Sequence, residues 1–182
     1  MADDNKPNDI LDYWASLGNE GWWVKNLKVD QEIHERFGKL HTEACNGKLD
    51  LWRASADGAL ALIIVLDQFS RNMFRGNARS FTQDNQALEI AKSAIDAGLD
   101  AEVREDLKVF FYLPFEHAET IFEQEKSVLY QYSIGNLESI KAALEHREII
   151  QRFGRFPHRN PALGRHTTPA EQAFLDDGGF KG

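Results

Sequence analysis

The sequence predicts an all-α protein of seven to eight antiparallel-packed helices, joined by short turns and without a significant sheet. Apolar residues recur at helical spacing, capping and breaking residues separate these segments, and no segment reads with confidence as a strand. We therefore expect the 182 residues to form a single helical domain. Its core array is expected over residues 8–168, and a short terminal helix with a frayed tail over residues 169–182.

Residues that cap or stop helices divide the first half of the chain. Asn8 or Asp9 is expected to cap a helix that stops at Gly18, and Asp30 to cap the next one. From Gly58 the run ALALIIVL fits either a buried strand or a buried helix. Helix is favoured because alanine and leucine are helix formers and because the apolar pattern continues at helical spacing. That pattern consists of Leu62, Val65, Leu66, Phe69 and Met73.

The next helices are expected to start at a capping box and at a proline. Residues 80–83 resemble a capping box. A helix break is expected at Leu113, because the residue before a proline avoids the α region. Pro114 would then begin a new helix that carries Glu116 and His117 in its first turn.

The last two helices have the clearest ends. Residues 137–153 show an amphipathic pattern that Gly154 is expected to terminate. Thr168 and Glu171 form a capping box, with Pro169 at the first helical position.

The composition indicates a cytoplasmic protein that binds neither nucleic acid nor membranes. A net charge of −8 repels both on average. The longest apolar run, Ala59 to Leu66, is too short to span a bilayer, and the acidic start lacks a secretion signal. Cys45 is the single cysteine, so no intramolecular disulfide can form, which fits a reducing compartment. We expect a monomer or a weak homodimer.

A basic segment between Gln151 and His166 contrasts with the acidic remainder. It holds four arginines and no acid, so it contributes +4 while the rest of the chain carries −12. Guanidinium groups on a loop stiffened by prolines suit recognition of a carboxylate or a phosphate. Alternatively, the same arginines neutralise acidic helix faces of the protein itself. The candidate ligand-binding residues are Arg152, Arg155, His158, Arg159 and Asn160 of this segment, together with Arg147 of the preceding helix.

Two further groups of polar residues are candidates for a site. One continues the core helix, and its alternative is an ordinary exposed helix end. The other is a row of carboxylates, Glu116, Glu119 and Glu123, expected on one helix face, where a solvated acidic surface is the alternative. Glu116 and His117 are the weak candidates for acid–base catalysis. The core-helix group consists of Asp67, Gln68, Arg71, Asn72 and Arg75.

Metal and cofactor chemistry has little support. The pattern Glu-His-x-Glu occurs at residues 116–119 and 145–148, but adjacent side chains diverge by about 100° on a helix. His41 and Cys45 could form a metal pair, but a complete site needs ligands from elsewhere. The chain lacks a Gly-rich phosphate loop, a Gly-x-Ser-x-Gly elbow and a Cys-x-x-Cys pair. We expect no metal and no cofactor.

Three long motifs are specific enough to compare with known families. They are LDQFSRNMFRG from Leu66, YLPFEHAE from Tyr112, and HREII from His146 leading into RFGRFPHRN at residues 152–160. Together they resemble a bacterial family of uncharacterised proteins, catalogued as domain of unknown function 924, and the resemblance covers nearly the whole chain. It implies a tetratricopeptide-like right-handed superhelix and no established activity. Its motifs coincide with the three groups above, which favours a single cleft.

The leading hypothesis is a binding module whose Arg-rich cleft accepts an anionic small molecule or an acidic peptide. An enzyme acting on an anionic substrate in the same cleft, with Glu116 or His117 as acid or base, is the alternative, and an enclosed pocket would favour it. A protein-interaction scaffold is the third hypothesis, which an open groove with exposed aromatic residues would favour. The sequence leaves open whether any reaction is catalysed. The arginines that motivate the leading hypothesis are Arg71, Arg75, Arg147, Arg152, Arg155 and Arg159.

Overall fold

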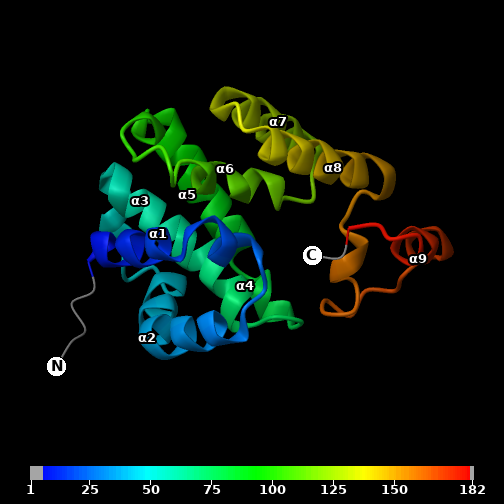
Figure 1. Cartoon of the computed structure of the whole chain (residues 1–182), viewed down its shortest axis with the longest axis horizontal. Helices are drawn as coiled ribbons and strands as arrows, with labels where there is room; N and C mark the ends of the chain where they lie inside the picture. The colour runs from blue at the N-terminus through cyan, green and yellow to red at the C-terminus, as the bar shows by residue number, and fades with distance from the viewer. Residues whose placement is uncertain (1–5, 181–182) are drawn as a thin grey trace. The chain divides into compact units, whose positions relative to one another are not determined.

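The computed structural model describes residues 6–180, and this part of the chain is all-α, as predicted, with no strand. Within it, no helix is long and apolar enough to cross a membrane. The α-helices are α1 Pro7–Trp23, α2 Leu27–Cys45, α3 Ala56–Ile63, α4 Ser70–Met73, α5 Asp84–Asp96, α6 Val109–Glu116, α7 Ile121–Ile134, α8 Leu137–Phe153 and α9 Pro169–Asp176 (Figure 1). A π-helical segment, η2, spans Ile64–Phe69, and the 3-10 segments are η1 Asp50–Ala54, η3 Ala78–Ser80, η4 Leu99–Ala101 and η5 Pro157–Arg159.

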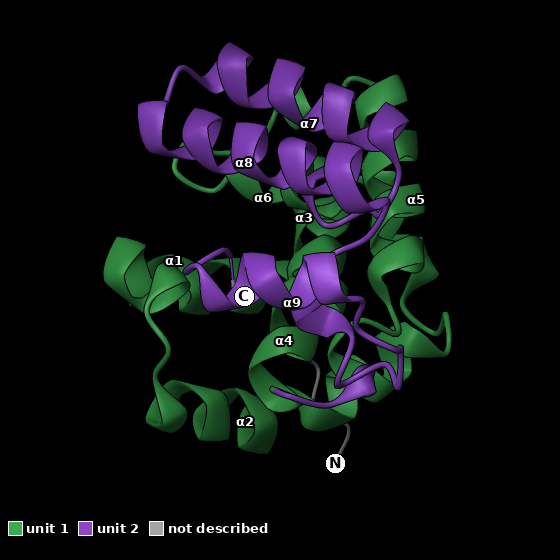
Figure 2. Ribbon diagram, turned by 90° about the vertical axis from the view of Figure 1, so that its right-hand side faces the viewer, with its two compact units in different colours: residues 1–75, 79–114 green, residues 76–78, 115–182 purple. Residues whose placement is uncertain are grey.

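The chain divides into two compact units (Figure 2). Unit 1 comprises the described residues up to Arg75 together with Arg79–Pro114, and unit 2 comprises Gly76–Ala78 and the residues from Phe115 onward. The division falls inside α6. A division into compact units does not show whether the units unfold together or separately. That the chain is a single domain therefore stays a prediction.

Unit 1 is built around one long helix. α3, η2 and α4 are continuous from Ala56 to Met73, and every residue from Gly58 to Ser70 is buried. α1 and α5 pack against α3, while α2 packs against η2 and α4. Gly58 has no room for a side chain, because a Cβ there would lie 2.1 Å from the carbonyl oxygen of Trp52. The predicted core helix is confirmed, and the strand alternative is excluded.

Several expectations for unit 1 need correction. Neither Asn8 nor Asp9 is the N-cap of α1, because the helix begins at Pro7 with Lys6 as its N-cap residue. Gly18 interrupts α1 with φ 63° and ψ −176°, but a second helical stretch continues to Trp23. Asp30 does not cap α2. Asn26 does, because its side-chain oxygen accepts from the backbone N–H of Lys28 and Val29. Asp30 is thereby one turn inside the helix and buried, which frees its carboxylate for tertiary contacts.

The capping box expected at residues 80–83 is also wrong. α5 begins at Asp84, and its N-cap residue Gln83 makes no side-chain capping bond. The hydroxyl group of Ser80 instead donates to the carbonyl oxygen of Phe74, a partner outside the local segment.

Pro114 does not break a helix, contrary to expectation. It lies inside α6, and no helix begins there. Most of α6 is buried, including the large side chains Phe110, Phe111, Tyr112 and Leu113, so packing outweighs the local preference of the residue before a proline.

In unit 2, α7 and α8 form an antiparallel pair that packs along its length. The predicted ends of α8 and α9 are confirmed. Gly154 ends α8 in the left-handed conformation, with φ 69°. Thr168 and Glu171 make the reciprocal capping box of α9, with Pro169 in the first turn. The basic segment therefore begins and ends at well-defined helix termini.

Candidate functional site

The candidate residues fall in both units. The core-helix group, Asp67 to Arg75, belongs to unit 1. Glu116, His117 and the basic segment belong to unit 2. Their grouping in one cleft stays a prediction, and the geometry is described unit by unit.

Arg71 is held between two carboxylates of unit 1. It bonds Asp84 with two nitrogens, at 2.9 and 3.1 Å, and its Nη1 lies 3.0 Å from Asp67 Oδ1. Burial alone would lower the pKa of Arg71, but the two acids raise it above its ordinary value. Gln68 also donates to Asp67, at 2.5 Å. Asp67, Gln68 and Arg71 of the core-helix group therefore form a hydrogen-bonded network within unit 1.

The other two residues of the core-helix group, Asn72 and Arg75, both bond to Asp30 of α2. Arg75 donates through Nε to Oδ2 at 2.5 Å and through Nη2 to Oδ1 at 3.0 Å. Asn72 donates to Oδ1 at 2.7 Å. Three donors thus neutralise a carboxylate whose side chain is 11% exposed, while the Arg75 side chain is 37% exposed. Asp30 therefore fixes the orientation of the Arg75 guanidinium, while part of the Arg75 side chain stays exposed to solvent.

An open depression of about 610 Å³ lies over this cluster, and we call it the Asp30–Arg75 groove. It combines two cations, two carboxylates, polar amides, a histidine and an apolar wall. Its lining residues are Lys25, Leu27, Asp30, Gln31, His34, Glu35, Asn72, Met73 and Arg75, all of them in unit 1.

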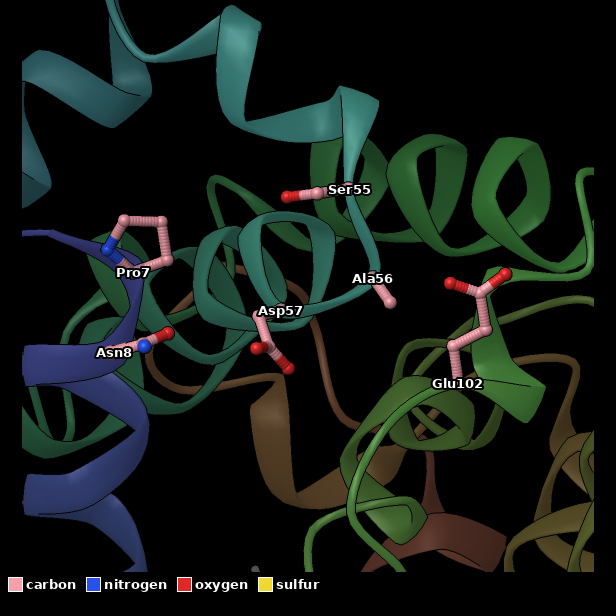
Figure 3. Close-up of a pocket in the computed structure, with 6 residues that line it drawn as sticks. All are labelled: Pro7, Asn8, Ser55, Ala56, Asp57 and Glu102. Carbon is pink, nitrogen blue, oxygen red and sulfur yellow. The ribbon is translucent and has the colours of Figure 1, made fainter.

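A second open depression of unit 1, of about 350 Å³, has the opposite electrostatic character (Figure 3). Asp57, near the start of α3, and Glu102, just after η4, both line it. None of its six lining residues is a cation. It therefore disfavours an anion, and the Asp30–Arg75 groove is the better candidate of the two.

In unit 2 the basic segment bonds strongly to acids of the same unit. Arg155 donates hydrogen bonds through Nε and Nη2 to the carboxylate of Glu171 in α9, at 2.6 and 2.9 Å. The same carboxylate accepts from the backbone N–H of Thr168 at 2.7 Å. Mainly through the Arg155 bond, the pKa of Glu171 falls from 4.5 to about 2. Arg155 thus ties the start of the segment to the helix that follows it.

Arg165 makes a second two-bond pair of the same kind, with Glu119. Its Nη1 and Nη2 lie 2.6 and 3.0 Å from the two oxygens of Glu119. Glu119 also accepts from the backbone N–H of Phe156 at 2.7 Å. Burial raises the pKa of Glu119, but these bonds outweigh it and leave the pKa below its ordinary value. Asn160 joins the two pairs, since its side chain contacts Arg165 and Glu171.

The other basic candidates are placed as follows. Arg159 is buried with its guanidinium over the ring of Phe156, 4.6 Å from the centroid. Arg152 lies over Phe153, at 4.7 Å, and Arg147 is 3.5 Å from Glu125. His158 is half-buried. The alternative of arginines neutralising acids of the protein itself therefore describes Arg147, Arg155 and Arg165.

The carboxylate row does not exist as predicted. Glu116 ends α6, Glu119 lies in the connection, and Glu123 is in the first turn of α7, so they share no helix face. The buried Glu116 instead meets His146 of α8, with 3.6 Å from Oε1 to Nδ1. His146 Nδ1 also lies 2.8 Å from the carbonyl oxygen of Ala142, so that nitrogen carries the proton.

Sequence reasoning missed the partners that complete these networks. His146, Asp84 and Glu171 were not candidates, and Asp30 was assigned only to a cap. The one usable signal was residue type, because a charged residue within an apolar helix pattern needs a partner. Among residues 6–180, no three His, Cys, Asp or Glu side chains are grouped to hold a metal ion.

The fold and the site together define an all-α protein whose arginines pair with carboxylates inside each unit. The chain belongs to the family described as bacterial protein of unknown function (DUF924), whose model matches residues 10–179. A solved structure of a protein of unknown function from Agrobacterium tumefaciens is similar, with 44% sequence identity and a TM-score of 0.90. The match covers 94% of this chain and 97% of that one. A search of curated proteins gives no match.

Proposed function

We propose that the protein is a cytoplasmic binding module and that the Asp30–Arg75 groove accepts the anionic group of a small molecule or an acidic peptide. The observation that carries this proposal is the state of Arg75. Its guanidinium is fixed by two bonds to buried Asp30, yet 37% of the side chain is exposed at the groove. A pre-oriented fork loses little freedom when it binds a carboxylate or phosphate.

The charges in the groove support an anion. The carboxylate of Asp30 is largely buried and already accepts three hydrogen bonds, from Asn72 and Arg75. Arg75 has five N–H donors, and two of them serve Asp30. Lys25 adds a second cation at the rim. Glu35 is the remaining acid, and it is exposed and accepts from Gln31 at 2.8 Å.

Binding is favoured over catalysis because the groove is open. Water reaches Arg75 directly, so the dielectric constant around a bound anion stays high and little extra stabilisation of a transition state is available. The exposed apolar wall at Leu27 suits a ligand that has an apolar part beside its anionic group.

A thermal-shift screen tests the proposal with phosphate, succinate, phosphorylated metabolites and capped peptides that end in a free carboxylate. Arg75→Lys should weaken binding, because it keeps the charge and removes the fork. The matched control is Arg104→Lys. Arg104 bonds Asp106 with two nitrogens at 2.7 Å and lies outside the groove. Equal loss of binding in both variants, or no stabilisation by any anion, would contradict the proposal.

The arginines of unit 2 remain part of a broader anion-binding proposal. Arg155 would have to exchange Glu171 for the incoming ligand, which makes binding there weaker than at Arg75. Arg159 is buried, so a ligand would reach it only after the segment moves. Competition between the internal carboxylates and the ligand is the physical reason for ranking the groove of unit 1 first.

An enzyme is the second candidate, and the buried Glu116–His146 pair is what favours it. A carboxylate beside an imidazole can move protons, and His146 replaces His117 as the partner of Glu116. A panel of chromogenic carboxylate and phosphate esters tests this function. Turnover should be lost in His146→Asn and kept in His117→Asn, and turnover that survives His146→Asn would rule out the pair.

A further inference from the structure

Helix α7 has its polar and apolar faces reversed. The side chains that it buries are mainly polar, namely Glu123, Gln124, Ser127 and Gln131, with Val128 as the apolar exception. Four large apolar side chains, each at least 46% exposed, occupy the opposite arc: Ile121, Phe122, Leu129 and Tyr132. An amphipathic helix of a monomer normally shows the reverse distribution. Glu125 is the charged residue among these exposed side chains, and large apolar side chains exposed together on one helix face mark an interaction surface.

The helix cannot roll to bury its apolar face. Gln124 Nε2 lies 2.7 Å from the carbonyl oxygen of Glu116 and 2.8 Å from that of Ala118, and it donates to both. On the other flank Glu125 is 3.5 Å from Arg147 of α8. Rotation would take the Gln124 amide away from these two carbonyl oxygens, which is unfavourable by about 1–3 kcal/mol for each buried group that loses its partner. Contacts within unit 2 therefore keep the apolar face of α7 directed towards solvent.

We propose that this face, defined as Ile121, Phe122, Leu129 and Tyr132, binds the same face of a second copy of the chain. A twofold axis between positions 125 and 126 would set the two α7 helices antiparallel. Phe122 then meets Leu129 of the other copy, and the pair occurs twice. Glu125, which pairs with Arg147 within its own copy, and Lys126, which pairs with Glu123, then lie opposite one another across the axis, so the charges there remain complementary.

The charge of the chain supports a second copy as the occupant. A protein of net charge −8 repels its own copies over most of its surface. This face carries one acid and one base at its centre, so two copies approach there without net repulsion. The face is short, because Ile121 and Tyr132 lie eleven residues apart and span about 16 Å of helix. The dimer is therefore expected to be concentration-dependent and not permanent.

Sedimentation equilibrium of the full chain, from low micromolar to millimolar concentration, tests the proposal. The wild-type protein should pass from monomer to dimer. Leu129→Arg should remain monomeric, and the matched control Leu51→Arg should dimerise like the wild type. Leu51 is 91% exposed, lies on η1 of unit 1, and is not part of the proposed face. A wild type that is monomeric throughout, or a dimer that Leu129→Arg leaves intact, overturns the proposal.

Charge-changed variants separate pairing from folding. Glu125→Lys alone and Lys126→Glu alone each place like charges opposite one another and should weaken self-association. An equimolar mixture of these two variants should form heterodimers, because both central pairs then become attractive. A purely structural effect of either substitution would not be restored by mixing. Absence of heterodimers from the mixture, when circular dichroism shows both variants folded, therefore overturns the register.

Discussion

Asp30 is the residue on which the groove depends. Its two oxygens accept three hydrogen bonds, from Asn72 and from two nitrogens of Arg75. Asp30→Asn should lower the free energy of unfolding by about 1–3 kcal/mol, because it removes the charge that these donors neutralise. Anion affinity should fall with it, since Arg75 loses its orientation. Urea denaturation of the variant measures the change.

The control for Asp30 is an exposed ion pair of the same chemistry. Asp106→Asn breaks the bonds to Arg104, whose side chain is 45% exposed, and should change stability by less than about 1 kcal/mol. Equal effects at the two aspartates would mean that burial of Asp30 contributes nothing to its bond with Arg75.

His41 is a buried histidine held in one tautomer. The hydroxyl of Ser70 donates to the carbonyl oxygen of Leu66 at 2.5 Å, so the 2.7 Å contact with His41 Nε2 places the proton on that nitrogen. Nδ1 then accepts from the thiol of Cys45 at 3.5 Å. Burial, assisted by the charge of Arg79, lowers the pKa of His41 from 6.5 to about 4.

This shift sets a pH dependence that NMR can follow. The unfolded chain takes up a proton near the ordinary pKa of 6.5 and the folded chain near 4, so His41 stabilises the fold above pH 6.5. That contribution is lost as the pH falls from 6.5 towards 4. The imidazole nitrogen shifts should report the Nε2–H tautomer down to about pH 5. A midpoint near 6.5 in the folded protein would refute the assignment.

At the scale of elements, the basic segment is a brace between α8 and α9. Because Arg155 holds the pKa of Glu171 near 2 against 4.5 in the unfolded chain, the bond contributes its stability above pH 4.5. That stability is lost as the pH falls from 4.5 to about 2. Acid unfolding followed by circular dichroism should show this dependence, and Glu171→Gln should flatten it. An unchanged acid profile in the variant would show that the brace is not formed in solution.

Some helix ends could be predicted from local signals, although the signals at Asp30 and at residues 80–83 failed. Gly154 and the Thr168–Glu171 box each specify a terminus within four residues, and both are confirmed. The helix predicted from Pro114 through Glu123 had the wrong start, since α7 begins at Ile121, and the exposed apolar and buried polar faces of α7 make periodicity give the wrong orientation. Partners distant in sequence were beyond local rules, since Glu119 and Arg165 are 46 positions apart. The contacts of the candidate residues could therefore not be predicted from local sequence.

At the scale of the whole molecule, the division into two units bears on cooperativity. It falls after Pro114, inside α6, so neither unit contains the whole of that helix. We expect one cooperative unfolding transition, as for a single domain. Differential scanning calorimetry should give equal calorimetric and van't Hoff enthalpies. Two resolved transitions would instead establish two independent domains.

The most direct test of the proposed anion binding is an NMR titration of the whole protein with inorganic phosphate and with succinate, following arginine Nε–H and asparagine amide signals. Arg75 and Asn72 should shift in a saturable manner, while Arg104 stays fixed and Arg155 shifts little. Arg75→Lys should lose the response at Asn72. Saturable shifts at Arg155 and Arg159 without any at Arg75, or no saturable shift at all, would contradict a groove at Asp30 and Arg75.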